Sequence, residues 1–180
     1  MNQRWRKLIA KFASAYILLC LTLYFQQQRL FFFPSRELKQ TPSSYQLDYQ
    51  DVWVWIPIAN TKQQTERLHG WWIRAKNPDA PVLFYFHHNA INISANITQA
   101  LQFQELGYSV FLFDYRGFGR SEGSFPTESQ VYEDAGAAWN YLTQERQIVP
   151  NKIIIYGHSI GGAVAIDLAS KHPEAAALIV

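Results

Sequence analysis

The sequence predicts an α/β fold, in which a mostly parallel, doubly wound sheet follows a leading antiparallel hairpin. Residues 82–86 form a continuous apolar run, and 109–113 and 152–156 are apolar after their first residue, as expected for strands that are buried on both faces. Segments with the spacing of helices separate these runs, and such alternation is typical of a parallel sheet that helices cover on both faces. The apolar run 176–180 opens a further strand.

The leading hairpin is expected before the first of these runs. Residues 51–58 read DVWVWIPI and carry apolar side chains on both alternating faces, which indicates a strand. The polar stretch 60–66 predicts a turn. The stretch 67–75 predicts the strand that returns antiparallel to the first.

Three helices are expected between and after the parallel strands. The apolar spacing that begins at Ile97 predicts a helix that ends at Gly107. Residues 127–145 predict a long amphipathic helix with Thr127 as its N-terminal cap. Residues 159–171 predict a third helix, which has small residues at its start.

The N-terminal segment is apolar enough to cross a membrane. Residues 12–25 carry no charge, and the apolar stretch reaches back to Leu8. A helix of that length rises about 27 Å, which is close to the hydrocarbon thickness of a bilayer. We therefore expect a membrane anchor over 1–28, a linker over 29–44 and a folded domain, incomplete at its C-terminal side, over 45–180.

Two other interpretations of the N-terminal segment stay open. A cleaved signal peptide has a similar charged start and apolar core, but no A-x-A site follows the apolar run here. A buried core helix is the other interpretation.

The charges at the start of the chain indicate the orientation of the anchor. Four basic residues and no acidic residue are found there: Arg4, Arg6, Lys7 and Lys11. Positive charge before the segment places the N-terminus in the cytoplasm, so the folded domain is expected on the non-cytoplasmic side of a single-pass protein. Basic residues that follow the segment argue against this orientation: Arg29, Arg36 and Lys39.

Composition argues against a nucleic-acid partner and against a disulfide. The formal net charge of +2 is too small to indicate a nucleic-acid partner. The single cysteine excludes an intrachain disulfide. The high content of aromatic residues, together with the expected anchor, favours a small lipid-like or acylated molecule as ligand.

A G-x-S-x-G pattern spans 157–161 and predicts a catalytic serine. It follows a predicted strand and opens a predicted helix, which is the context that this pattern requires. Gly157 and Gly161 lack a Cβ atom, so the strand and the helix can approach closely around the turn. Ser159 is therefore expected to be a nucleophile above the end of the strand. The alternative is an ordinary glycine-rich helix start with a capping serine.

Two backbone N–H groups are expected to stabilise an oxyanion beside this serine. The first is that of Ile160, at the N-terminus of the predicted helix. The second should come from the loop after the 82–86 strand, where Asn89 is the candidate. The adjacent His87 and His88 are not interpreted as metal ligands, because neighbouring side chains point in different directions and no further Cys, His or Asp cluster lies nearby.

Five segments together resemble one family: HHNAIN (87–92), LFDYRGFGRSEG (112–123), PTE (126–128), YEDAGAAWNYL (132–142) and IIYGHSIGGAVAIDLA (154–169). From about Leu30 to Val180 the chain resembles the BEM46-like branch of the α/β-hydrolases, whose members often carry an N-terminal membrane segment. The resemblance implies an α/β-hydrolase fold and hydrolysis of an ester or thioester by a Ser-Asp-His triad without a cofactor.

The resemblance also implies roles for individual residues. Ser159 matches the family nucleophile, and Asn89 and Ile160 match the residues whose amides form its oxyanion hole. Asp114 matches an aspartate of the D-Y-R-G turn. We interpret Asp114 as a structural residue that bonds N–H groups of the following glycine-rich turn, and not as the triad acid. His158 adjoins the serine in sequence but points elsewhere, which makes it a poor general base.

The sequence departs from the family pattern in two ways. His88 stands where the family usually has glycine, and a histidine there resists some backbone shapes that glycine permits. The triad acid and histidine are expected after Val180, so the fold is expected to be truncated after the strand that follows the nucleophile helix. The chain alone is therefore either the first part of an active serine hydrolase or a catalytically inactive, membrane-tethered binding module.

Overall fold

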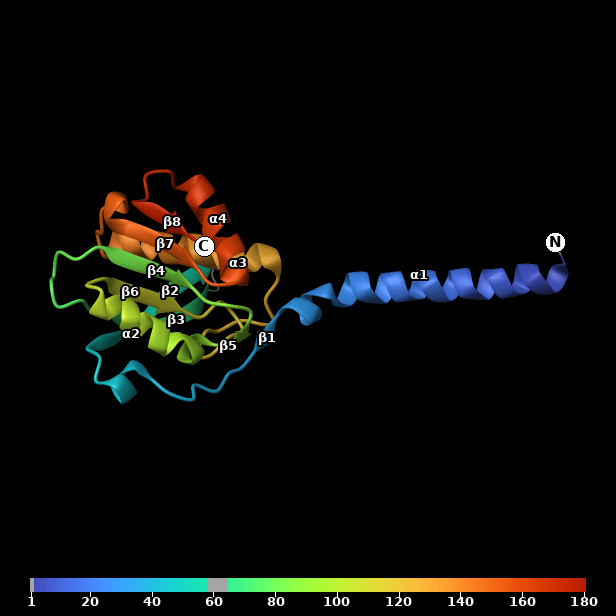
Figure 1. The fold of residues 1–180 in the computed structure, drawn as a ribbon, viewed down its shortest axis with the longest axis horizontal. Coiled ribbons are helices and arrows are strands. Elements are labelled where there is room, and N and C mark those ends of the chain that lie inside the picture. Colours follow the sequence, from blue (N-terminus) through green and yellow to red (C-terminus); the bar gives the residue numbers. More distant parts are fainter. Residues whose placement is uncertain (1, 58–64) are drawn as a thin grey trace. The chain divides into compact units, whose positions relative to one another are not determined.

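The computed structural model describes residues 2–57 and 65–180, which form two compact units. The first unit ends at Phe32 and consists of helix α1 (Gln3–Phe31). The second unit begins at Phe33 and holds the sheet and the remaining helices, as Figure 1 shows.

Helix α1 is longer than the sequence indicates. It has 29 residues, and Asn2 caps it by accepting a hydrogen bond from the backbone N–H of Arg4 at 3.4 Å. None of its side chains is buried, as they would be in a core helix. By length and composition it can cross a membrane, although an N-terminal signal sequence meets the same criteria.

The second unit contains a six-stranded sheet in the order β2-β3-β6-β4-β7-β8. Its strands are β2 (Tyr49–Pro57), β3 (Thr65–Ile73), β4 (Val82–Phe86), β6 (Ser109–Phe113), β7 (Ile153–Gly157) and β8 (Ala177–Ile179). Strand β3 pairs antiparallel with β2 and with β6, whereas β6, β4, β7 and β8 run parallel. The predicted fold class, a mostly parallel sheet with a leading antiparallel hairpin, is confirmed. Most of the predicted turn 60–66 lies outside the described residues.

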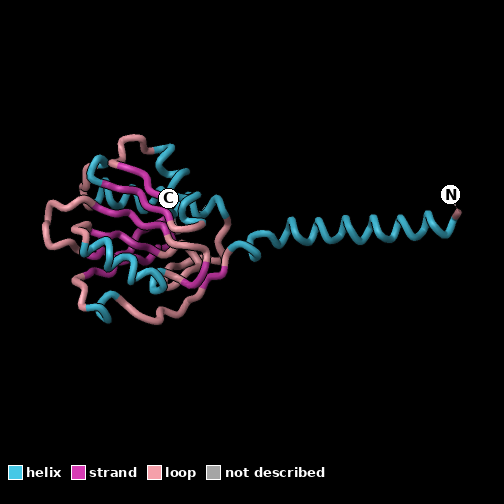
Figure 2. The backbone as a smooth tube through the Cα atoms, in the orientation of Figure 1, coloured by secondary structure: helices cyan, strands magenta, loops and turns pink. Residues whose placement is uncertain are grey.

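Three α-helices cover the two faces of this sheet (Figures 1 and 2). Helix α2 (Ile97–Glu105) packs on one face, and α3 (Glu128–Asn140) and α4 (Ile160–Lys171) pack together behind the other. Helix α3 starts with a capping box between Thr127 and Gln130 and continues into a π-helical turn over Tyr141–Glu145.

The core consists of two apolar layers because successive strand residues point to opposite faces. On the α2 face, Tyr85 and Leu112 pack with Ile97. On the other face, Phe84 stacks on Phe111 with ring centroids 5.6 Å apart. All five of these side chains are fully buried, and each contributes about 1.5–3 kcal/mol of hydrophobic stabilisation. The packed middle of the sheet therefore holds the C-terminal ends of β4, β6 and β7 in position.

The segment 29–44, expected to be a linker, contains regular structure. Helix α1 extends to Phe31, a short 3₁₀ helix spans Pro42–Tyr45, and β1 (Phe33–Pro34) pairs in parallel with β5 (Ala90–Ile91). The N–H of Ser35 also donates to the carbonyl of Ile91 at 2.8 Å. The first residues of the second unit are therefore hydrogen-bonded to the loop after β4.

A buried ion pair ties the glycine-rich loop after β6 to helix α3. Asp134 is fully buried, and its carboxylate accepts hydrogen bonds from the backbone N–H and from Nε of Arg116, both at 2.8 Å. The same guanidinium reaches Glu133 at 3.2 Å, but that carboxylate is largely exposed. The same arginine therefore pairs with one buried and one exposed carboxylate.

Replacing Asp134 should destabilise the protein far more than replacing Glu133. The change Asp134→Ala removes the buried partner of a buried arginine, leaves only the exposed Glu133 beside it, and should lower the free energy of unfolding by about 3–5 kcal/mol. Glu133→Ala removes an exposed partner and should cost at most about 1 kcal/mol. Urea unfolding of both variants measures the difference, and equal losses would contradict the assignment.

Candidate active site

The turn between β7 and α4 holds Ser159 in an unusual conformation. Its φ is 58° and its ψ is −121°, in a region that residues with a side chain rarely adopt. Such a conformation costs on the order of 1–3 kcal/mol and persists only where surrounding structure enforces it. The side chain is exposed, and it makes no capping hydrogen bond with α4. The turn thus presents a hydroxyl group to solvent.

Two glycines make this turn sterically possible. A Cβ atom on Gly157 would come within 2.4 Å of the carbonyl oxygen of Gly161. A Cβ atom on Gly161 would come within 2.3 Å of the carbonyl oxygen of Phe86, at the end of β4. The N–H of His158 also donates to Phe86 at 3.0 Å. The first turn of α4 is therefore pressed against the start of the loop that follows β4.

This loop contains Asn89, the second candidate oxyanion donor, while Ile160 is the first residue of α4. The carbonyl of Asn89 accepts a hydrogen bond from the N–H of Phe33 at 2.8 Å. His88, which replaces the family glycine, is partly buried, and its Nδ1 accepts from the N–H of Ala90 at 3.1 Å. The His88 side chain thus supports the turn of its own loop.

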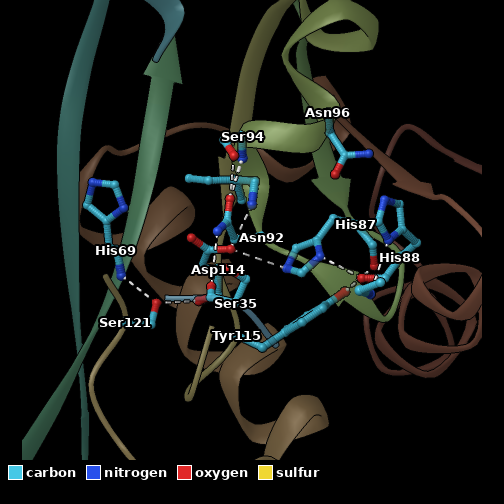
Figure 3. A network of polar contacts seen from close by, with 12 residues as sticks. Ser35, His69, His87, His88, Asn92, Ser94, Asn96, Asp114, Tyr115 and Ser121 are labelled. Carbon is cyan, nitrogen blue, oxygen red and sulfur yellow. Dashed lines mark hydrogen bonds and ion pairs between the residues drawn. The ribbon is translucent and has the colours of Figure 1, made fainter. Parts of the chain in front are cut away.

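Behind the loop lies a buried pair, His87 and Asp114, shown in Figure 3. His87 Nε2 is 3.6 Å from Asp114 Oδ1, and both side chains are fully buried. Burial lowers the pKa of His87 to about 3, and burial raises the pKa of Asp114 well above its usual value. Both effects favour uncharged side chains at neutral pH.

Asp114 does not bind the partners that the sequence analysis assigned to it. Its Oδ1 accepts a hydrogen bond from the N–H of Ile93 at 2.8 Å, whereas the glycine-rich turn contacts its backbone carbonyl through Ser121 Oγ at 2.6 Å. The prediction was wrong about the partner because residues 89–93 cross over the end of β6, a long-range packing that local sequence does not reveal. Gly119 lies so close that an added Cβ would come within 2.0 Å of Asp114 Oδ2.

The sequence analysis also missed the role of Asn92. This side chain is fully buried, and its Nδ2 donates to the carbonyls of Ser35 and Glu37 at 3.0 and 2.7 Å (Figure 3). Its Oδ1 accepts from the N–H of Ser94 at 3.0 Å. The second asparagine of the HHNAIN segment was the available signal. Asn92 fastens the loop to the segment that follows α1.

Within the described residues, no imidazole hydrogen-bonds Ser159: His158 Nδ1 is buried without a partner, and the ring centroids of His158 and His88 are 5.5 Å apart. Across 2–57 and 65–180, no group of three or more His, Cys, Asp or Glu side chains is arranged to hold a metal ion. What the described part of the site offers is an exposed hydroxyl group at the N-terminus of α4.

Comparison with known proteins identifies the family. Residues 80–180, more than half of the chain, match the family described as serine aminopeptidase, S33. The chain belongs to this family of α/β-hydrolases. The resemblance found in the sequence is confirmed, since the relatives include the Bem46 protein itself.

Two relatives show how far the similarity extends. The α/β-hydrolase domain-containing protein WAV2 of Arabidopsis thaliana is 31% identical over 155 residues, which cover 82% of this chain and 48% of WAV2. The Bem46 protein of Schizosaccharomyces pombe is 32% identical over 168 residues, which cover 89% of this chain and 54% of Bem46. The chain spans about half the length of these relatives.

Solved structures agree with this assignment. The esterase Pf2001 of Pyrococcus furiosus is similar to this chain with a TM-score of 0.61 and 27% identity, over 79% of this chain and 55% of the esterase. An α/β-hydrolase from Vibrio vulnificus gives a TM-score of 0.63 and 26% identity, over 79% of this chain and 50% of that structure. The chain therefore has an esterase-like α/β-hydrolase fold.

The contact of Gly161 with Phe86 predicts a sharp difference between two glycine substitutions. Gly161→Ala should destabilise the protein by several kcal/mol, because the new methyl group has no space between α4 and β4. In contrast, Gly136→Ala on α3 meets no atom within 4 Å and should stabilise the helix by up to about 1 kcal/mol. Thermal unfolding of the two variants tests this, and a neutral Gly161→Ala would refute the close approach.

Proposed function

We propose that the protein to which this chain contributes is a serine hydrolase, which cleaves an ester, thioester or amide through an acyl-serine intermediate. The observation that carries the proposal is the conformation of Ser159, an exposed residue at φ 58° on a turn between strand and helix. A strained serine at such a turn, in an esterase-like member of the α/β-hydrolases, is the arrangement expected of a nucleophile.

In this mechanism, Ser159 Oγ attacks the carbonyl carbon of the substrate, and its proton passes to a general base. The carbonyl oxygen becomes an oxyanion, which accepts hydrogen bonds from the backbone N–H groups of Ile160 and Asn89. The positive end of the α4 dipole further stabilises this charge. The tetrahedral intermediate expels the leaving group, which takes up the proton. Water then attacks the acyl-serine ester, releases the acid and restores Ser159.

The general base of this mechanism comes from a histidine that follows the serine in the chain, as it does in the α/β-hydrolase order of Ser, then Asp or Glu, then His. The activity therefore belongs to the full-length protein. The substrate is a small molecule, and the apolar helix α1 favours a lipid-like or acylated one that partitions to a membrane.

Covalent labelling tests this proposal directly. The full-length protein should react with a fluorophosphonate probe, and Ser159→Ala should abolish labelling because no other hydroxyl group takes its place. Ser170→Ala, a change of an exposed serine at the other end of α4, should label like the wild type. In-gel fluorescence reads the result.

A folded wild-type protein that resists the probe would contradict the proposal. The protein would then be a membrane-tethered binding module that retains the architecture of a hydrolase without its chemistry. A melting curve of the same sample separates this outcome from simple misfolding.

Helix α1 anchors the protein in the membrane with its domain on the non-cytoplasmic side. Full-length protein should stay in the membrane pellet after an alkaline wash, whereas deletion of residues 3–31 should release it. Protease added to the non-cytoplasmic side should digest the domain. A mature protein whose N-terminal sequence begins after α1 would identify that helix as a cleaved signal sequence instead.

A further inference from the structure

A single buried imidazole, that of His87, lies at the start of the loop after β4. His87 is fully buried and packs its ring against Tyr115 and Phe118, with centroid distances of 4.4 and 5.2 Å. The hydroxyl group of Tyr115 donates to the carbonyl of His87 at 3.2 Å. Ring and backbone of this residue are therefore both held, so the positions of its two nitrogen atoms are defined.

One of these nitrogens binds the peptide that carries the candidate oxyanion donor. His87 Nδ1 lies 2.6 Å from the carbonyl oxygen of His88. Because a carbonyl oxygen only accepts, Nδ1 must carry the hydrogen. The carbonyl of His88 and the N–H of Asn89 belong to the same planar trans peptide, in which they point in opposite directions. A bond that draws the carbonyl towards His87 thus turns the Asn89 N–H away from it.

The other nitrogen faces Asp114. His87 Nε2 is 3.6 Å from Asp114 Oδ1, which also accepts from the N–H of Ile93 further along the same loop. The backbone of Gly119 lies directly against the carboxyl group of Asp114, which leaves that group little room to move. Figure 3 shows the imidazole between the carboxyl group and the carbonyl. At this distance Nε2 lies beside the carboxyl group without a hydrogen bond to it, so Nδ1 makes the hydrogen bond that fixes the ring.

The charge state of this pair agrees with such a role. Burial lowers the pKa of His87 to about 3, so the ring is neutral at physiological pH, with its hydrogen on Nδ1. The hydrogen bond to the His88 carbonyl raises the pKa of His87 and the His88 side chain lowers it, and both effects are smaller than that of burial. Burial also raises the pKa of Asp114, and the N–H of Ile93 and the Arg36 charge oppose that rise.

We propose that His87 is a positioning residue of the oxyanion hole, which orients the His88–Asn89 peptide through its Nδ1–H and whose ring is held by packing against Tyr115 and Phe118. This inference rests on the proposed function only in naming the Asn89 N–H as an oxyanion donor. The orientation of the peptide is a property of the fold, and it can be measured without any activity.

Two substitutions separate positioning from mere packing. Asparagine places an amide N–H near the position of Nδ1 and keeps a donor to the carbonyl of His88, but it leaves part of the pocket empty. Phenylalanine fills the pocket and stacks on Tyr115, but it has no donor. His87→Phe should therefore be at least as stable as His87→Asn, while retaining less activity.

In the full-length protein, the order of the two variants by activity should be the reverse of their order by stability. With a p-nitrophenyl acyl ester, His87→Phe should lose about 100-fold in kcat with little change in KM, because a misdirected donor weakens only the transition state. His87→Asn should recover most of that loss, although its melting temperature is the lower of the two. As a control, His69→Phe removes another buried histidine that pairs with a carboxylate, Asp51, and should leave kcat within about threefold.

Activity that follows melting temperature across all four proteins would overturn the proposal, and so would a kcat for His87→Phe equal to that of His87→Asn. If the wild type neither labels nor turns over, the proposed function fails, and hydrogen–deuterium exchange over residues 87–93 decides the inference alone. Uptake should rise in His87→Phe and fall back towards the wild-type level in His87→Asn. Equal uptake in the two variants would refute a positioning role.

Discussion

The arrangement of the site depends on one close contact, in which the first turn of α4 lies against the backbone at the end of β4. Gly161 makes this contact possible, because any side chain there would collide with the carbonyl of Phe86. The contact brings the turn that holds Ser159 next to the loop that holds Asn89. Two segments separated by about seventy residues in sequence are thereby brought together at the proposed site. The strained backbone of Ser159 is the local cost of this arrangement, and the parallel sheet beneath it supplies the rigidity that maintains it.

The loop after β4 needs separate support because its regular structure is limited to β5 and a short 3₁₀ helix over Ile93–Asn96. Three sets of contacts support the loop. His87 packs beside Asp114, the Asn92 side chain bonds the carbonyl of Ser35, and the short strand β1 pairs with β5. The side chains of His87 and Asn92 are fully buried, so their hydrogen bonds are stronger than the equivalent bonds in water. The pairing of β1 with β5 also means that the chain leaving the apolar helix is tied directly to the proposed oxyanion loop.

The sheet and the nucleophile turn could be predicted from the sequence because their signals are local. Continuous apolar runs such as 82–86 mark strands buried on both faces, and the glycine spacing around Ser159 reflects a steric requirement of adjacent residues. The partner of Asp114 could not be predicted, since its bond to Ile93 joins residues on different strands and loops. Strand β1 was missed for a related reason: two residues carry no periodicity, and Phe33–Pro34 becomes a strand only through tertiary pairing.

The central claim is that Ser159 and the amides of Ile160 and Asn89 surround one reacting carbonyl group. A crystal structure of the full-length protein with a phosphonate bound covalently to Ser159 tests it most directly. The account predicts that the phosphoryl oxygen lies about 2.7–3.1 Å from both backbone nitrogens, since it occupies the place of the oxyanion. A phosphoryl oxygen that points away from Asn89, with the His88 carbonyl turned towards it instead, would contradict the account.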